Sequence, residues 1–437
     1  MTLASLAARA ALPLTLLLFP AAAASQPVAP AQAEAALSEM ERLVRERYVA
    51  VDKREPLAAV LRAGRASGRY GVTDPHELAV RVTEDLRAAS GDGHLSLSWD
   101  PAEHAQLSAA PAGQDAGEAD AYAEEARRAN HGLGEMRILD GNVRYLRLDT
   151  FHWVPDATGE AYDGAMRFLR DGDAVIIDIR GNGGGSDRAV RYAVSHFMPG
   201  EPERLLMTFN DDEGRPDQSR VHGYLPAGRV TRGPLYVLAD GGSFSAAEEF
   251  AYHVKHFRLG TLVGERTGGG ANNNALFPVA PGFVASISVF VPKHAVTGGN
   301  WEGTGVEPDV AAASRDALAA AHLHALEALA AKDGPGRARH AWALPAARAA
   351  LRPVALKPAE LARYAGRYGD RAVEVRDGAL VYRREGQPDA RLTPLGDGLF
   401  AIEGRTSARL RFPAGGKASA LEVLRADGSS ASHPRTR

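Results

Sequence analysis

Three short turns in the chain carry residues of the kind used in acyl-transfer chemistry, and the first contains Ser245. This serine stands directly before residues 246–257 (AAEEFAYHVKHF), which have helical patterning. A hydroxyl at a helix start lies at the positive end of the helix dipole and beside unpaired backbone N–H groups. That environment would suit a nucleophile and a developing oxyanion. Serine is also a common N-cap residue, and on this turn alone the capping role is favoured.

The other two turns supply glycines and a histidine. Glycines 183–185 follow the apolar segment 173–180 (DAVIIDIR), and His94 ends the sequence GDGH. Glycines let backbone amides approach a ligand closely, as an oxyanion hole requires, although a tight strand-to-helix turn would also explain them. A lone histidine in a loop is usually structural or solvated, yet imidazole is also the natural general base near neutral pH.

The composition narrows the chemistry further. The 437 residues include no cysteine, which excludes disulfides, cysteine-bound metals and a thiol nucleophile. With 51 basic and 54 acidic residues the chain lacks the basic character of a nucleic-acid binder. It contains no P-loop, HExxH, GxSxG or Ser-x-x-Lys motif. His253 and His256 lack an evident third ligand, so we expect a partly exposed helix face there, and neither a metal ion nor a cofactor.

The elements that must position these turns change in type along the chain. Residues 31–90 have the apolar spacing of three helices. The β-branched run at 173–180 and the apolar runs at 235–240 and 261–265 predict strands covered on both faces, and the helical segments between them indicate α/β layering. Residues 359–435 form short alternating segments separated by Gly and Asp turns, which predicts a small β-rich C-terminal domain.

The N-terminus predicts an export signal. Residues 1–24 place one arginine before a short apolar stretch and a run of alanines. The stretch is too short to cross a bilayer comfortably. We therefore expect cleavage near Ala24, a periplasmic or secreted location, and no stable membrane insertion afterwards.

Taken together, the turns resemble the S41 family of serine peptidases, which includes the C-terminal processing (tail-specific) proteases, the tricorn protease and the interphotoreceptor retinoid-binding protein. The resemblance covers about residues 31–330. It rests on the N-terminal helices that end at GDGH and on four ordered motifs at 178–185 (DIRGNGGG), 239–248 (ADGGSFSAAE), 263–269 (VGERTGG) and 301–309 (WEGTGVEPD). It implies a ClpP/crotonase-like α/β core.

This resemblance sets the expected domain order. No PDZ domain is expected, because the interval between the helices and the core is too short for one, so we do not expect tail recognition by that route. The domains are a signal peptide (1–24), an N-terminal helical bundle (31–92), an S41-like catalytic core (93–330), a linker (331–358) and a small β-rich, lipocalin-like C-terminal domain (359–437).

The resemblance also implies the roles of individual residues. The family's nucleophile maps to Ser245, and its oxyanion donors map to the backbone N–H groups of Gly184 and Ala246. Processing proteases use a lysine base, but the matching position here is Gly270, and only six of the 51 basic residues are lysines. In the tricorn and retinoid-protein branch the base is a histidine, which maps to His94.

An imidazole base needs an orienting partner, and Glu302 is the best candidate. The tricorn-type relay also uses a serine directly before the histidine. Gly93 stands there in this chain, so we expect a shortened relay.

The favoured function is a secreted serine-type peptidase that hydrolyses peptide or protein substrates through an acyl-enzyme on Ser245. An esterase stays open, since amide and ester hydrolysis share this machinery. A non-catalytic binder of an apolar ligand or peptide also stays open; Phe277, Phe283 and Phe290 would then line a pocket, although sheet core is the favoured role for them. Whether the chain forms a homo-oligomer stays open as well.

Overall fold

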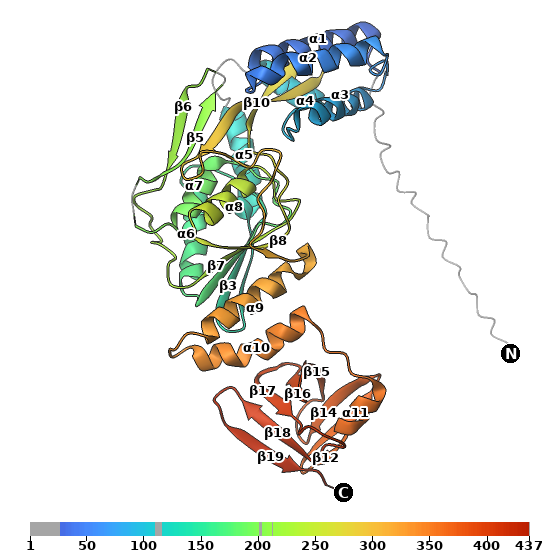
Figure 1. Ribbon diagram of the computed structural model, residues 1–437, viewed down its shortest axis with the longest axis vertical. Helices are drawn as coiled ribbons and strands as arrows, with labels where there is room; N and C mark the ends of the chain where they lie inside the picture. The colour runs from blue at the N-terminus through green and yellow to red at the C-terminus, as the bar shows by residue number, and fades with distance from the viewer. Residues whose placement is uncertain (1–26, 110–115, 201–202, 212, 437) are drawn as a thin grey trace, which may run out of the picture.

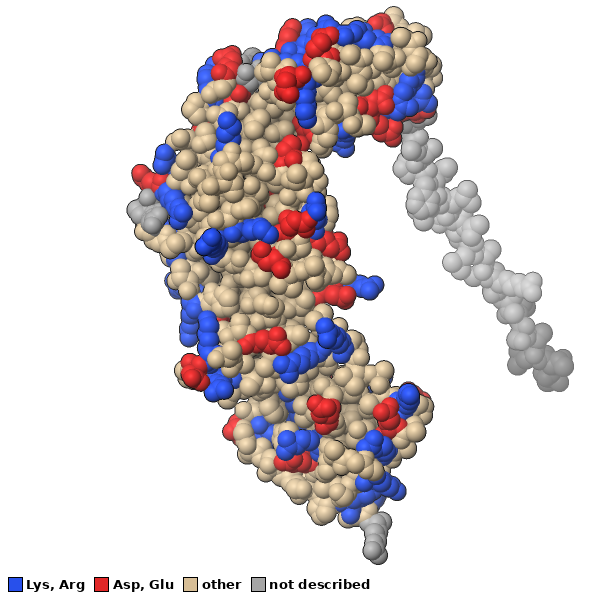
Figure 2. Space-filling model, viewed as in Figure 1, with Lys and Arg blue, Asp and Glu red and all other residues tan. Residues whose placement is uncertain are grey.

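The computed structural model describes residues 27–109, 116–200, 203–211 and 213–436. The predicted signal peptide, residues 1–24, lies outside these residues. Along the long axis, helices at one end are followed by a mixed α/β centre and then by a β-rich end that carries the C-terminus (Figure 1). Among the helices of the described ranges, none is both long and apolar enough to cross a bilayer. Basic and acidic side chains are interspersed over the visible face (Figure 2).

The described part of the chain begins with the three helices that the sequence predicts, α1 (Pro30–Arg47), α2 (Val51–Ala66) and α3 (Pro75–Ser90). Their apolar faces are buried together: Leu37, Leu61 and Val82 belong to the same core as Phe283 and Ile287 of a neighbouring sheet. The helices therefore cover one face of that sheet instead of forming an independent core.

This first sheet is antiparallel and has the order β1-β10-β5-β6, with β9 also pairing with β10. Its strands are β1 (Ser96–Trp99), β5 (Leu205–Asp211), β6 (Pro216–Arg220), β9 (Asn273–Val279) and β10 (Phe283–His294). In the pairing of β1 with β10, Ser96 lies opposite Ser286. Since β1 begins two residues after His94, this register helps to fix the position of that histidine.

The second sheet has the order β11-β8-β7-β4-β3-β2 and is parallel apart from the β2–β3 pair. Its strands are β2 (Leu133–Leu139), β3 (Val143–Leu148), β4 (Ala174–Asp178), β7 (Leu235–Ala239), β8 (Gly260–Gly264) and β11 (Val310–Ala311). The segment between β1 and β2 contains α4 (Pro101–Ala109), α5 (Ala116–Arg128) and a short 3-10 helix (Asn130–Gly132).

Helices cover both faces of the second sheet. Ile177 and Val237 face the core shared with α6 (Ala157–Arg170), α7 (Asp187–Ser195) and α8 (Ala246–His256). Their strand neighbours Ile176 and Tyr236 face the core shared with α9 (Ala317–Ala330) and α10 (Arg337–Leu351). The predicted α/β layering is therefore confirmed.

The three central strands bring the sequence motifs to one edge of this sheet. β4, β7 and β8 are parallel neighbours, and they lead into residues 179–186, 240–245 and 265–270. The carboxyl ends of parallel strands meet at the same edge of a sheet, where ligands commonly bind.

The C-terminal end is an antiparallel sheet in which β12 to β19 follow one another in sequence order. A bridge between Arg367 and Thr436 joins its two ends into a barrel-like structure. The predicted β-rich C-terminal part is confirmed. It contains α11 (Pro358–Tyr364), β12 (Gly366–Tyr368), β13 (Arg371–Arg376), β14 (Ala379–Arg384), β15 (Ala390–Gly396), β16 (Leu399–Ile402), β17 (Arg405–Arg411), β18 (Ala420–Arg425) and β19 (Ser430–Pro434).

The segment expected as a linker, residues 331–358, is largely helical. It contains α10, which packs on α9. The indole N–H of Trp342, on α10, donates a hydrogen bond to the carbonyl of Thr406 at 3.1 Å. This connection is therefore packed against both of its neighbours.

The burial of His253 and of three phenylalanines differs in part from what the sequence predicts. His253 is fully buried and lies 3.3 Å from Glu249 (Nε2 to Oε1), so the expected exposure of its helix face is wrong at this residue. Of the three phenylalanines, Phe283 is fully buried in the sheet core, Phe277 is partly buried, and Phe290 is 37% exposed. Sheet core, the favoured role, holds fully for Phe283 alone.

Candidate active site

Ser245 lies at the N-cap of α8 in a strained backbone conformation. Its φ and ψ are 54° and −119°, a region that residues with side chains seldom adopt. Strain of this kind costs about 1–3 kcal/mol and concentrates at functional sites. The Oγ of Ser245 lies 3.1 Å from Nε2 of His94. Ser245 thus occupies the N-cap position, as a capping serine would, while its hydroxyl is paired with the imidazole of His94.

The turn that carries Ser245 is anchored by the buried carboxylate of Glu248. One oxygen, Oε2, accepts the N–H groups of Ser245 at 3.0 Å and Gly270 at 2.8 Å. The other, Oε1, accepts the hydroxyl of Thr267 and the N–H of Gly269. Burial raises the pKa of Glu248, and these hydrogen bonds oppose that rise. Glu248 was not among the predicted site residues; a serine followed three positions later by glutamate was the available signal.

His94 lies in the loop between α3 and β1. Gly91 ends α3 in a left-handed conformation, the N–H of His94 donates to Oδ1 of Asp92 at 2.9 Å, and its carbonyl accepts the hydroxyl of Ser286 at 2.6 Å. The side chain is only 9% exposed. Burial lowers the pKa of His94, against the opposing effect of Asp92. The imidazole is therefore neutral near neutral pH and able to accept a proton.

The ring of Phe244 packs against the imidazole and occupies space left by glycines. The centroids of the Phe244 and His94 rings are 4.8 Å apart. A Cβ added to Gly270 would lie 2.1 Å from the Phe244 ring and 2.9 Å from Cε1 of His94, and one added to Gly93 would lie 2.9 Å from Phe244. A lysine at position 270 would therefore displace the residue that holds His94.

Two carboxylates lie behind the imidazole. Among the described residues, Nδ1 of His94 has no hydrogen-bond partner, and Oδ1 of Asp92 is 4.0 Å away from it. Glu302 completes this group: one donor atom from each of Asp92, His94 and Glu302 lies within 4.8 Å of the other two. The structure thus brings Glu302 to the site as expected, but it adds Asp92, which sequence reasoning missed although it stands two residues before His94.

The contacts of these carboxylates differ. Oε2 of Glu302 accepts the N–H groups of Ala271 at 2.7 Å and Asn272 at 2.8 Å, whereas the buried Oε1 has no partner within the part of the chain that the structure describes. Asp92 is 1% exposed, and its Oδ2 accepts the hydroxyl of Tyr48 at 3.0 Å. Burial, followed by the nearby charge of Asp92, raises the pKa of Glu302 to about 7.

The two expected oxyanion donors lie beside Ser245 in different states. Ala246 is the first residue of α8, where N–H groups have no partner within the helix. Gly184 has a φ of 113°, and a Cβ added to it would lie 2.8 Å from Cβ of Ser245. However, its N–H donates to Oδ1 of Asn182 at 2.8 Å. One donor is thus available, and the other must first release a side chain.

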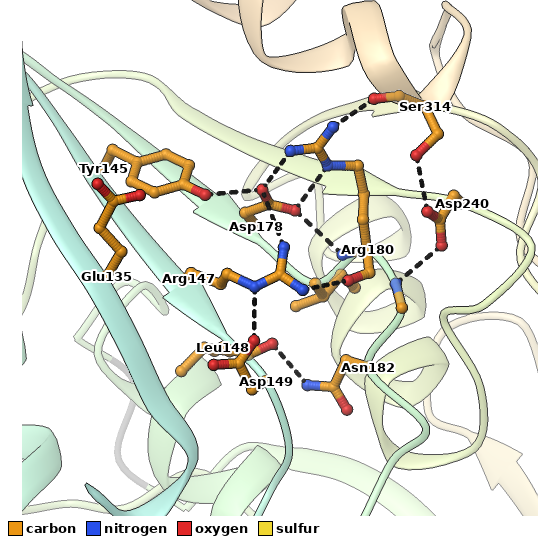
Figure 3. A network of polar contacts seen from close by, with 12 residues as sticks. Glu135, Tyr145, Arg147, Leu148, Asp149, Asp178, Arg180, Asn182, Asp240 and Ser314 are labelled. Carbon is orange, nitrogen blue, oxygen red and sulfur yellow. Dashed lines mark hydrogen bonds and ion pairs between the residues drawn. The ribbon is translucent and has the colours of Figure 1, made fainter. Parts of the chain in front are cut away.

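A buried polar network holds the glycine turn that contains Gly184 (Figure 3). The fully buried Asp178 accepts hydrogen bonds from Arg180 at 2.6 and 2.9 Å and from the hydroxyl of Tyr145 at 2.8 Å. Burial alone would raise the pKa of Asp178, but these partners hold it below its usual value. The N–H of Gly181 donates to Oδ1 of Asp240 at 2.9 Å, which ties the turn after β4 to the turn after β7.

Comparisons with known proteins agree with the arrangement of these motifs. Residues 142–312 match the model of peptidase family S41, and residues 29–128 match the N-terminal domain of Peptidase_S41 in eukaryotic IRBP. Both matches are to peptidase family S41, so the predicted resemblance to this family is confirmed.

Two curated relatives share part of the chain. The carboxy-terminal processing protease CtpB of Bacillus subtilis (strain 168) is 27% identical over 198 residues, which cover 45% of this chain and 39% of the relative. The carboxyl-terminal-processing protease of Synechocystis sp. (strain ATCC 27184 / PCC 6803 / Kazusa) is 29% identical over 154 residues, which cover 35% and 34%. The matched part thus spans little more than a third of either relative.

Solved structures with a similar course of the chain include two further proteins. A lipoprotein from Streptococcus agalactiae is 16% identical, with a TM-score of 0.45 over 69% of this chain and 98% of that one. Mature CPAF is 14% identical, with a TM-score of 0.46, and the match covers 66% of this chain and 94% of that one.

Proposed function

We propose that this protein is a serine-type peptidase that cleaves peptide bonds through an acyl-enzyme on Ser245. The observation that carries the proposal is the 3.1 Å separation between Oγ of Ser245 and Nε2 of His94. It joins a strained residue at a helix start to a buried, neutral imidazole from a different part of the chain. This is the pairing of nucleophile and base that acyl transfer requires.

In the first half of the reaction, His94 takes the proton of Ser245 as Oγ attacks the substrate carbonyl. The imidazolium then directs its Nδ1–H toward Asp92, whose charge stabilises it, with Glu302 adjacent. We therefore assign the orienting role to Asp92 and Glu302 together. The proton passes next to the departing amine, which leaves the acyl group on Ser245.

The oxyanion formed in this step needs backbone donors. The N–H of Ala246 is directed from the start of α8, and the N–H of Gly184 joins it when Asn182 gives up its hydrogen bond. In the second half, His94 takes a proton from water as the water attacks the acyl group, and it returns that proton to Oγ of Ser245 as the acid leaves. An ester would follow the same steps.

Replacement of Ser245 tests this proposal directly. We expect Ser245→Ala to lower peptide hydrolysis by about 10,000-fold or more and to abolish labelling by a fluorophosphonate probe. Both curated relatives are named for processing at carboxy termini, so peptides with a free carboxy terminus are the first substrates to test, beside simple esters. Ser38→Ala on the exposed surface of α1 is the control and should behave like the wild type. Undiminished hydrolysis by Ser245→Ala would refute the assignment.

We also propose that the chain is exported and that residues 1–24 are removed. The support is the composition of this segment, a single arginine before a short apolar run and small residues. N-terminal sequencing of the protein recovered from a periplasmic or culture fraction should begin close to residue 25. Recovery of the intact N-terminus would contradict cleavage.

A further inference from the structure

The most unusual feature of the candidate site is the unpaired polar surface behind His94. Nδ1 of His94 and Oε1 of Glu302 are both buried without a hydrogen-bond partner among the described residues, and Oδ1 of Asp92 lies beside them. Buried polar atoms of native proteins nearly always have partners. One donor atom from each of these three side chains lies within 4.8 Å of the other two, so the side chains converge on one position.

We propose that Asp92, His94 and Glu302 form a zinc site that inhibits the enzyme. One imidazole and two carboxylates are ligands that Zn²⁺ accepts, and water would supply the fourth position. Two carboxylates also balance the charge of the ion, which a buried site requires. No metal ion was expected from the sequence, in which Asp92 and His94 stand two residues apart but Glu302 lies in a distant segment.

The distances leave room for an ion. Zinc binds nitrogen and oxygen at about 2.0–2.2 Å, so its tetrahedral ligand atoms lie roughly 3.3–3.6 Å apart. The Asp92 to His94 pair is 4.0 Å apart and no pair in the group exceeds 4.8 Å, so an ion would draw the side chains together.

The remaining oxygens of the two carboxylates are already held. Tyr48 donates to Oδ2 of Asp92 at 3.0 Å, and the backbone N–H groups of Ala271 and Asn272 donate to Oε2 of Glu302 at 2.7 and 2.8 Å. Outer contacts of this kind orient metal ligands and increase affinity. They leave Oε1 of Glu302 without a partner in the described residues, while Oδ1 of Asp92, which accepts the backbone N–H of His94 at 2.9 Å, keeps a second lone pair for an ion.

Zinc at this position would remove the base. A neutral imidazole carries one proton, and an ion on Nδ1 forces that proton onto Nε2. The tautomer changes by transfer of the proton from Nδ1 to Nε2 through solvent, and any proton on Glu302 leaves to water. Nε2 of His94 then donates to Ser245 instead of accepting its proton. This consequence rests on the proposed function, whereas the binding of zinc does not.

Zinc binding can be measured without any catalysis. We expect equilibrium dialysis against ZnCl₂ to load one zinc per chain onto the full chain and equally onto Ser245→Ala. Glu302→Gln and Asp92→Asn should each weaken binding at least 10-fold, while the exposed Glu307→Gln should not change it. Histidine-selective NMR of the wild type should show zinc on Nδ1 of His94, which needs no variant. Absence of bound zinc, or binding that Glu302→Gln leaves unchanged, overturns the site.

Inhibition is tested separately by labelling of Ser245. We expect zinc to slow fluorophosphonate labelling at least 10-fold and EDTA to restore it. Labelling that proceeds without zinc binding would refute the zinc site and keep the peptidase. If zinc binds but the zinc-free protein is not labelled by the probe, the proposed peptidase is refuted and the metal site is kept.

Discussion

The two sides of the candidate site are built differently. On the nucleophile side, each oxygen of Glu248 accepts two hydrogen bonds, and these contacts fix the turn that carries Ser245. On the base side, His94 and Glu302 each present a buried polar atom without a partner in the described ranges, next to Asp92. The nucleophile side is fully paired and the base side is not.

This difference matches what each side has to do in the proposed reaction. An attacking hydroxyl gains from being held in one position, since orientation supplies much of the rate enhancement. A general base must gain and lose a proton in every cycle, and unpaired neighbours allow its surroundings to respond. The same unpaired atoms make the base side open to a competing cation.

The largest expected effect comes from breaking the paired side. Glu248→Gln places an amide group against donors, so at least one of them loses its acceptor, and we expect a loss of about 3 kcal/mol in unfolding free energy. Hydrolysis should fall together with stability, because the turn of Ser245 is released. Chemical denaturation and peptide assays measure both.

The neighbouring Glu249→Gln is the matched control. Burial raises the pKa of Glu249 well above its usual value, which favours the neutral carboxyl that an amide resembles. We expect a much smaller change in stability than for Glu248→Gln. Equal losses of unfolding free energy in the two variants would mean that the hydrogen bonds of Glu248 are not the cause of its larger expected effect.

An intermediate effect is expected from disturbing the packing of the base. In Gly270→Ala the new methyl group meets the ring of Phe244, and we expect about a 100-fold loss of peptide hydrolysis because the imidazole of His94 is displaced. The double variant Gly270→Ala with Phe244→Leu makes room for the methyl group and should recover part of the activity. Wild-type activity in Gly270→Ala would show that Phe244 does not position the base.

The smallest expected effect is a dependence of folding stability on pH, which comes from Glu302 on the base side. The pKa of Glu302 is raised to about 7 from an ordinary value of 4.5, so between these values the unfolded chain loses its proton before the folded chain does. The contribution of Glu302 to stability therefore declines as the pH rises from about 4.5 to 7. The Tm of the wild type, measured relative to that of Glu302→Gln, should fall by several degrees between about pH 4.5 and 7. Above about pH 7 the difference in Tm should stay constant. A Tm difference that is constant below this pH as well would contradict the raised pKa.

Much of the site was predictable because its motifs are local. The helix start at Ser245, the glycine turn after a buried strand and the GDGH turn each follow from short stretches of sequence. The strands covered on both faces were also recognisable, since continuous apolar runs are typical of parallel sheets. The structure then brought Ser245 and His94 together at hydrogen-bond distance, although 151 positions separate them.

Other features were not predictable because they depend on contacts between distant segments. Three such features are the role of Asp92 beside Glu302, the contact of Phe244 with Gly270, and the burial of His253. The packing within the segment expected as a linker was not predictable for a related reason, since it depends on the contact of α10 with α9.

The sequence by itself determined the residue types, the α/β layering and the absence of a lysine at the position of the alternative base. Only the tertiary structure decided which atoms of these residues are paired. Local patterns of sequence fix where turns and helices begin, but the pairing of a buried polar atom depends on every segment packed around it. For this reason the nucleophile could be predicted from its own turn, while the unpaired surroundings of His94 appear only in the folded chain.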